Sequence, residues 1–260
     1  AIVKANAYGH GAVEISQALA RKGIGRFAVA SLEEGITLRQ AGLATPIVVL
    51  GALFDQQLAD LVAHRLTPVI SNGSILPALT QAASLHPSPY PVHLKIETGM
   101  GRLGFSPDEL RPLLDNPLWR NALHVEGLMT HLADADGTDI AFTERQLGVF
   151  QAILEQVRRR GLPLPLVHTA NSAAIVRFPE SHYSLVRPGI MLYGYHTLPT
   201  SMPAPDLQPV LSLRTTIAHI RTIPRGGTVS YNRTFIANRP TRIAVLPIGY
   251  ADGYSRQLSN

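Results

Sequence analysis

A lysine stands at the end of an apolar run near the start of the sequence, which reads IVKANAYGHG. The chain contains three lysines, namely Lys4, Lys22 and Lys95. Partial burial favours the neutral amine of a lysine, and a neutral amine can attack an aldehyde to form a Schiff base. Lys22 precedes Gly23 at the expected end of a helix, where a cation is favourable, so we interpret it as a surface residue. Lys95 lies within a predicted strand, whereas Lys4 stands at the end of one, which makes Lys4 a candidate for covalent binding of an aldehyde cofactor.

Other polar residues directly follow short β-rich runs of the sequence. They are Ser71, Arg102, His131, Asn171, Ser172 and Arg187. Each of them alone is ordinary loop content. If the runs are parallel strands of one barrel, however, their carboxyl ends meet at one face, where these residues converge with Lys4. This convergence predicts an active site at that face.

Eight β-rich runs, with helical segments between them, are expected to position these residues. The predicted strands are Ile2–Ala5, Phe27–Ala30, Ile47–Leu50, Pro68–Ser71, Val92–Glu97, Val125–Thr130, Leu166–Thr169 and Tyr183–Arg187. Helices are predicted at Ala12–Arg21, from a capping box of Ser31 and Glu34 to Gly42, near Asp55–Arg65, at Ser74–Ser84, at Pro107–Asp115 and at Ala141–Arg160. This alternation predicts an α/β fold, a (β/α)₈ TIM-like barrel over residues 1–200.

The composition changes after the barrel, where the proline-rich stretch Leu198–Pro209 predicts a linker. Beyond it the pattern indicates antiparallel strands: apolar residues alternate from Leu211 to Ile217, Pro224–Gly227 predicts a turn, and Val229–Phe235 and Arg242–Pro247 are strand-like. We therefore expect residues 201–260 to begin a mainly antiparallel β domain. Because the chain starts at Ala1 and ends after so few strands, we expect a fragment with a truncated β domain.

Charge and composition exclude several classes of protein. The net charge of +5 comes from scattered arginines, apart from Arg158–Arg160, so no basic stripe predicts nucleic-acid binding. No apolar run is long enough to span a membrane. The chain has no cysteine, so the cytoplasm is the default location. Only 16% of residues are charged, against about 25% in an average domain, which suggests that surface is buried in an oligomer.

One motif typical of other chemistry is present but has a better interpretation, and metal-binding histidine motifs are absent. Gly99, Gly101 and Gly104 spell G-x-G-x-x-G, the dinucleotide-binding fingerprint, but they fall in the fifth βα unit, where a turn with unusual backbone angles is the better interpretation. The ten histidines contain no H-x-x-x-H or H-E-x-x-H pair, so we predict no metal.

The stretch VKANAYGHG resembles the pyridoxal phosphate (PLP) lysine signature of alanine racemases, a family with a barrel followed by a β domain. Six further blocks agree in order, namely LKIETGMGRLGF, GLMTHLADAD, HTANSAA, VRPGIMLYG, TVSYNRTF and PIGYADGYSRQLSN. The resemblance implies that Lys4 binds PLP, that Tyr8 and Ser172 hold its phosphate beside Asn171, and that the backbone of Gly189 and Ile190 completes this cradle.

By the same resemblance, Arg187 faces the pyridine nitrogen of the cofactor and His131 supports Arg187. A guanidinium does not give up its proton, so it leaves that nitrogen unprotonated and the cofactor a weaker electron sink. Arg102 corresponds to the arginine that contacts the cofactor and the substrate carboxylate. Lys95 matches a lysine that is often carbamylated, which would make it an anion able to orient Arg102. The alternative for Lys95 is an ion pair with a carboxylate such as Glu97.

A racemase removes the α-proton on one face and returns a proton on the other, which is simplest with two bases. The resemblance assigns one face to Lys4 and the other to Tyr231, which reaches the partner's barrel in a homodimer. Read without the family, Tyr231 is a packing aromatic. Tyr250 matches a tyrosine at the substrate entry.

The expected function is PLP-dependent interconversion of L- and D-alanine, which supplies D-alanine for peptidoglycan synthesis. One alternative is a racemase of serine or broader specificity, because size discrimination by a pocket is difficult to deduce from sequence. Another is a non-catalytic PLP-binding barrel, which would lack a β domain and an opposing tyrosine. A third, a PLP decarboxylase, would place an acidic residue where this chain has Arg187.

Overall fold

The computed structural model describes residues 1–84, 86–115, 122–161, 164 and 166–258. It divides into two compact units, Ala1–Val210 and Leu211–Asn260. No helix among the described residues is long and apolar enough to cross a membrane.

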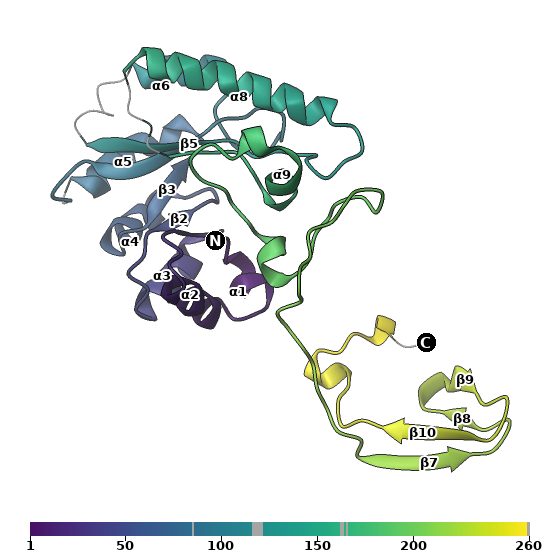
Figure 1. Ribbon diagram of the computed structural model, residues 1–260. Helices are drawn as coiled ribbons and strands as arrows, with labels where there is room; N and C mark the ends of the chain where they lie inside the picture. The colour runs from purple at the N-terminus through teal and green to yellow at the C-terminus, as the bar shows by residue number, and fades with distance from the viewer. Residues whose placement is uncertain (85, 116–121, 162–163, 165, 259–260) are drawn as a thin grey trace. The chain divides into compact units, whose positions relative to one another are not determined.

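The first unit is built on a six-stranded parallel sheet in which each strand pairs with the next one along the chain (Figure 1). The strands are β1 (Phe27–Val29), β2 (Ile47–Val49), β3 (Thr67–Ile70), β4 (Tyr90–Lys95), β5 (Leu123–Met129) and β6 (Leu166–His168). Every residue of β1, β2 and β3 is buried, as expected when helices cover one face of a parallel sheet and barrel packing covers the other.

Helices connect these strands and cover their outer side (Figure 1). They are α1 (Lys4–Tyr8), α2 (Ala12–Arg21), α3 (Leu32–Gln40), α4 (Leu58–Ala63), α5 (Leu76–Ala83), α6 (Pro107–Leu114), α8 (Ala141–Arg159) and α9 (Ser172–Arg177). Short 3₁₀ turns lie at Asp55–Gln57, Gly73–Ile75, Pro179–Ser181 and Ile190–Tyr193. The predicted helices are confirmed within a few residues, including the capping box of Ser31 and Glu34.

The inner and outer faces of the barrel follow from the alternation of side chains along each strand. Phe27 and Val29 belong to the main hydrophobic core, whereas Ala28 between them belongs to a small separate cluster with Ile2 and Met129. On β4 the same alternation sends Val92 and Leu94 outward and leaves the buried His93 and Lys95 for the interior. Several polar side chains therefore project into the barrel.

The first and last of the eight predicted strands are not regular strands, and in this respect the prediction was wrong. Ile2 makes only an isolated bridge with Ala28, because the chain turns into a left-handed conformation after Lys4. At the other end Tyr183 has a φ of 45°, and Pro188 has no N–H to donate. The two segments still link β6 to β1 through single backbone bonds, such as Arg187 N to Ala170 O at 3.0 Å, Ile2 N to Pro188 O at 3.1 Å and Val3 N to Ala28 O at 2.9 Å.

The second unit contains two antiparallel strand pairs. β7 (His219–Ile223) pairs with β10 (Thr241–Val245), and β8 (Thr228–Val229) pairs with β9 (Phe235–Ile236). Short 3₁₀ turns lie at Tyr231–Arg233, Tyr250–Asp252 and Arg256–Leu258. The expected fold class, a barrel-like domain followed by an antiparallel β domain, is confirmed.

Two strand predictions in the second unit were wrong. The alternating segment 211–217 forms no regular strand among the described residues. Val229–Phe235 is not one strand but a reversal between β8 and β9, because Ser230, Asn232 and Arg233 adopt left-handed φ angles of 59°, 57° and 51°.

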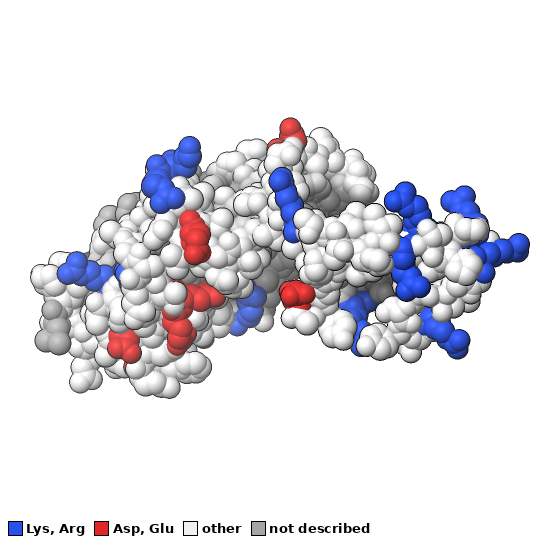
Figure 2. All heavy atoms as spheres, turned by 90° about the horizontal axis from the view of Figure 1, so that it is seen from below, with Lys and Arg blue, Asp and Glu red and all other residues white. Residues whose placement is uncertain are grey.

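Exposed arginines are concentrated in the second unit, whose sequence has Asp252 as its only carboxylate side chain (Figure 2). They are Arg214, Arg221, Arg225, Arg233, Arg239, Arg242 and Arg256. The arginines are thus less evenly scattered than the sequence interpretation assumed.

Candidate active site

A pocket of about 400 Å³ opens at the carboxyl ends of the strands of the first unit. Its wall contains all the site residues that the family resemblance assigns in this unit: Lys4, Tyr8, Lys95, Arg102, His131, Asn171, Ser172, Arg187, Gly189 and Ile190. Ser71, singled out only because it follows a strand, is not among the residues that line it. Polar residues from the ends of distant strands therefore meet around one cavity.

Lys4 is half-buried at the point where the chain leaves the barrel wall. The next four residues, Ala5 to Tyr8, have φ angles of 51° to 54°, so α1 contains a left-handed turn. This conformation costs roughly 1–2 kcal/mol for each residue other than glycine. Such strain persists where surrounding contacts hold it in place, and it is common at functional sites.

Glu34 supplies one of these contacts. Its carboxylate accepts the Ala5 N–H at 2.7 Å through Oε1 and the Ala30 N–H at 2.7 Å through Oε2. Asn6 adds a second contact, because its Oδ1 accepts the Ala12 N–H at 2.8 Å. This role of Glu34 was not predicted from the sequence, where the residue was interpreted only as part of a helix cap. The available signal was that Glu34 follows the second predicted strand closely, as the other predicted site residues follow theirs.

Ser172, Gly189 and Tyr8 form one corner of the pocket. The Oγ of Ser172 accepts the Gly189 N–H at 2.9 Å and the Met191 N–H at 3.4 Å. A Cβ placed on Gly189 would lie 2.7 Å from the Tyr8 hydroxyl oxygen, so glycine permits this close approach. Burial raises the pKa of Tyr8, and its hydroxyl therefore keeps a proton to donate. Hydroxyl and backbone donors of this kind suit an anionic group such as a phosphate.

Asn171 supports this corner from behind. Its Oδ1 accepts the Ala174 N–H at 3.0 Å and so caps α9, the helix that begins with Ser172. Its Nδ2 donates to the Leu132 carbonyl at 3.3 Å, in the segment that follows β5. Asn171 thereby fixes Ser172 relative to the neighbouring strand end.

Arg187 is buried in the floor of the pocket and is surrounded by acceptors. Its Nη1 donates to the His168 carbonyl at 2.8 Å, and its Nη2 donates to the carbonyls of Thr130 at 2.8 Å and Thr169 at 2.9 Å. No carboxylate among the described residues forms an ion pair with it. Burial lowers the pKa of Arg187 to about 10, which leaves the guanidinium charged at neutral pH.

His131 is held as a neutral imidazole beside Arg187. Burial, followed by the nearby cations Arg187, Lys95, Arg102 and Lys4, lowers the pKa of His131 to about 3. The Arg187 Nη2 lies 3.2 Å from His131 Nδ1, and because arginine only donates, Nδ1 must accept. The single imidazole proton is therefore on Nε2.

Lys95 lies in the pocket wall near Arg102. Burial and the charges of Arg102 and Arg187 lower the pKa of Lys95 to about 8, and Glu97 only partly opposes this effect. The alternative of a Lys95–Glu97 ion pair is not found among the described residues. Glu97 instead accepts backbone N–H groups from Gly99 and Arg102. A neutral Lys95 amine is thus accessible near physiological pH.

The G-x-G-x-x-G motif forms the turn around Glu97. Gly99, Gly101 and Gly104 have φ angles of 136°, 69° and 129°. A Cβ on Gly104 would lie 2.7 Å from the Glu97 backbone nitrogen. The interpretation of this motif as a turn with unusual backbone angles is confirmed.

Tyr231 and Tyr250 belong to the second unit, each at the start of a 3₁₀ turn. The Tyr231 side chain is 82% exposed, which excludes the packing role considered for it within its own unit. The Arg256 guanidinium lies 5.9 Å from the centre of the Tyr250 ring. Among the described residues of both units, no group of three or more potential metal ligands occurs.

Comparisons with known proteins agree with this geometry. Residues 1–197 match the family model "Alanine racemase, N-terminal domain", and residues 210–260 match "Alanine racemase, C-terminal domain". Alanine racemase from Carboxydothermus hydrogenoformans is 43% identical over 260 residues, which are 100% of this chain and 70% of that protein.

Solved structures are similar over nearly the whole chain. Alanine racemase from Bacillus anthracis with bound L-Ala-P has a TM-score of 0.84 at 33% identity, covering 99% of this chain and 67% of that one. Alanine racemase from Bartonella henselae with covalently bound pyridoxal phosphate has a TM-score of 0.82 at 30% identity. The match covers 99% of this chain and 70% of that one.

Proposed function

The chain belongs to the alanine racemase family, and from this premise we propose that it binds PLP through Lys4 and interconverts L-alanine and D-alanine. The observation that carries the proposal is the pocket that joins Lys4 to Arg187 and Ser172 from distant parts of the chain. The relatives with bound pyridoxal phosphate and with L-Ala-P support this cofactor and a small amino-acid substrate.

The pocket residues fit this cofactor. The hydroxyls of Tyr8 and Ser172 and the backbone of Gly189 and Ile190 would hold its phosphate, and Gly189 has no side chain to obstruct the approach. Asn171 positions Ser172 through the cap of α9. When bound, PLP supplies an electron sink for the charge left on the α-carbon after deprotonation.

Arg187 limits how strongly that charge is drawn away. The guanidinium stays charged and only donates, so a ring nitrogen that faces it remains an unprotonated acceptor. The neutral His131 accepts from Arg187 and does not compete as a cation. This arrangement favours return of the proton over side reactions that need a long-lived carbanion, such as transamination.

Two bases exchange the proton in this proposal. The Lys4 amine serves one face of the α-carbon and the Tyr231 phenol serves the other. A free phenol has a pKa of about 10, so it needs a nearby cation to act as a base. Tyr231 is exposed in its own unit, which supports a role in a homodimer, where it would complete the partner subunit's barrel.

Arg102 and Lys95 prepare the substrate side of the pocket. Arg102 would bind the substrate carboxylate, and a carbamate on Lys95 would provide an anion that orients Arg102. The low pKa of Lys95 supports this modification, because carbon dioxide reacts with the neutral amine. Tyr250 would line the substrate entry.

The wider assignments follow from the same proposal. Residues 1–200 would be the PLP-binding barrel and residues 201–260 the beginning of the β domain. D-Alanine made in the cytoplasm would supply peptidoglycan synthesis.

The test combines a racemisation assay with the cofactor spectrum of the purified protein. Release of D-isomers from L-alanine, L-serine and L-lysine is followed with D-amino-acid oxidase. Lys4→Ala should abolish both racemisation and the visible absorbance band of the cofactor, whereas Lys22→Ala, at the exposed end of α2, should change neither. A band that persists in Lys4→Ala would place the attachment elsewhere, and PLP binding by the wild-type protein without turnover would favour the alternative of a non-catalytic PLP-binding barrel.

A further inference from the structure

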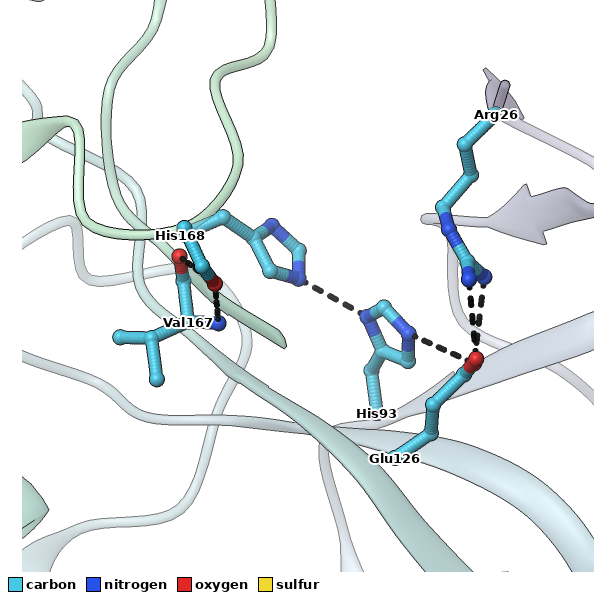
Figure 3. Close-up of polar contacts among 6 residues, drawn as sticks. Arg26, His93, Glu126, Val167 and His168 are labelled. Atoms are coloured by element: carbon cyan, nitrogen blue, oxygen red, sulfur yellow. Dashed lines mark hydrogen bonds and ion pairs between the residues drawn. The ribbon is translucent and has the colours of Figure 1, made fainter. Parts of the chain in front are cut away.

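A line of buried polar contacts continues from Arg187 through the interior of the barrel. Arg187 Nη1 lies 2.9 Å from His168 Nδ1, His168 Nε2 lies 2.8 Å from His93 Nδ1, and His93 Nε2 lies 3.3 Å from Glu126 Oε2. Figure 3 shows the two imidazoles pointing toward each other, with Glu126 held in turn by both terminal nitrogens of Arg26. His93 and His168 are almost fully buried.

The far end of this line lies opposite the catalytic pocket. Glu126 and Arg26 border a groove with Pro46, Thr67 and Pro91, each of which lies within one residue of the amino end of a strand. The catalytic pocket is at the carboxyl ends. The contacts therefore cross the barrel from one end to the other.

The chemistry of the two ends fixes the direction of every hydrogen bond between them. Arginine only donates, so His168 Nδ1 must accept from Arg187, and a neutral His168 then has its proton on Nε2. That proton is donated to His93 Nδ1, which leaves the His93 proton on Nε2 for Glu126. The reverse direction would place an N–H of His168 against an N–H of Arg187.

Both imidazoles are neutral in the folded protein. Burial lowers the pKa of His168 well below its usual value, and Arg187 adds to this effect. Burial also lowers the pKa of His93, although Glu126 partly opposes it. Glu126 remains an anion, because its hydrogen bond from His93 and its pairing with Arg26 lower its pKa to about 2 despite partial burial.

We propose that Glu126 is a positioning residue for Arg187: as the terminal acceptor of the chain, it fixes the tautomers of His93 and His168, so that His168 always offers a lone pair to the guanidinium. Arg187 then keeps one orientation in the pocket floor. The inference rests on the proposed function, in which Arg187 faces the cofactor.

The tautomers can be measured without a cofactor. ¹⁵N NMR of the apoprotein at neutral pH should show His93 and His168 as neutral rings with the proton on Nε2. A charged ring, or a proton on Nδ1 of either residue, would overturn the proposed direction of the hydrogen bonds between Arg187 and Glu126. This measurement needs no variant and remains valid if the protein binds no PLP, so failure of the proposed function is recognised separately.

The variant Glu126→Gln tests the role of the acceptor. A carboxamide has one oxygen and one NH2 group, and in the orientation that places the NH2 group toward His93 the ring must accept at Nε2. His93 should therefore acquire a population with the proton on Nδ1. The PLP dissociation constant should rise about tenfold, equivalent to about 1.4 kcal/mol. Asp115→Asn is the matched control, because it removes a carboxylate from the Arg160 ion pair at 3.1 Å and should change neither readout.

A second variant interrupts the series of hydrogen bonds from Arg187 to Glu126 without removing a charge. A Cβ on Gly127 would lie 2.7 Å from His93 Nδ1, so Gly127→Ala should displace the His93 ring and weaken PLP binding in the same way. If both variants reduce only thermal stability, and leave the His168 tautomer and the PLP dissociation constant unchanged, then Glu126 is a structural residue and the proposal is wrong.

Discussion

The α-carbon of Gly189 lies so close to the hydroxyl of Tyr8 that a Cβ at residue 189 would approach the Tyr8 oxygen to 2.7 Å. Gly189→Ala should therefore push Tyr8 out of the phosphate corner. Displacement of a binding group by about 1 Å can reduce activity by about a hundredfold, so we expect a loss of tenfold to about a hundredfold in PLP affinity. Fluorescence titration of the apoprotein with PLP measures this affinity.

The matched control is Gly148→Ala, in the middle of α8, where an added Cβ meets no atom within 4 Å. Alanine is the better helix former by about 1 kcal/mol, so this variant should be slightly more stable and should bind PLP normally. Equal PLP affinity in both variants would show that the contact with Tyr8 does not matter.

Arg187→Lys should damage the protein although it keeps the charge. A lysine amine is a point donor and cannot reach the carbonyls of Thr130, His168 and Thr169 together. Each buried acceptor left without a donor costs about 1–3 kcal/mol, so the free energy of unfolding in urea should fall by a few kcal/mol. Arg111→Lys, on the exposed side of α6, should have little effect. An equal loss of unfolding free energy in both variants would contradict the special role of the Arg187 guanidinium in bonding several carbonyls at once.

The neutral His131 makes the protein sensitive to acid. Its pKa is about 3 in the folded state and about 6.5 in the unfolded chain, so below pH 6.5 unfolding takes up a proton. The contribution of the neutral His131 to the free energy of unfolding is complete above pH 6.5. It is lost as the pH falls toward 3, by up to about 1.4 kcal/mol per pH unit. Urea unfolding at several pH values should show a shallower slope between pH 6.5 and 4 for His131→Asn than for wild type. The exposed His124→Asn should keep the wild-type slope, and identical slopes in all three proteins would refute this account.

Much of the barrel could be predicted because its signals are local. The capping box of Ser31 and Glu34 marked the start of α3, and short apolar runs marked six regular strands. The pocket residues were identified from their position after strands together with family motifs. A parallel barrel converts such positions into proximity, since all strand ends meet at one face.

The remaining features depend on contacts between distant residues. The left-handed turn after Lys4 is held partly by Glu34. Ala5 and Ala7 are residue types that do not predict a left-handed conformation. His93 reads as one polar residue inside an apolar strand, and its partner His168 is 75 residues away. The break at Ser230 was missed because Val229 and Phe235 flank it with strand-like residues.

Lys95 should react reversibly with carbon dioxide. Its pKa of about 8 leaves part of the amine neutral at physiological pH, and the neutral form attacks carbon dioxide to give a carbamate. Protein in ¹³C-labelled bicarbonate should show a carbamate signal by ¹³C NMR that is lost in Lys95→Gln and kept in Lys22→Gln. A spectrum without that signal in wild type would leave Lys95 as a plain amine beside Arg102.

Tyr231→Phe should separate the two proton transfers. The free energies of L- and D-alanine are equal, so the loss of one base lowers kcat/KM equally in both directions, by about a hundredfold or more. The Lys4 amine can still exchange the α-proton on its own face, so in deuterated water one enantiomer should acquire deuterium much faster than it inverts. Mass spectrometry of the separated enantiomers measures both rates. Tyr254→Phe, at another exposed tyrosine of the second unit, should racemise normally. Wild-type kinetics in Tyr231→Phe would mean that a different group serves the second face.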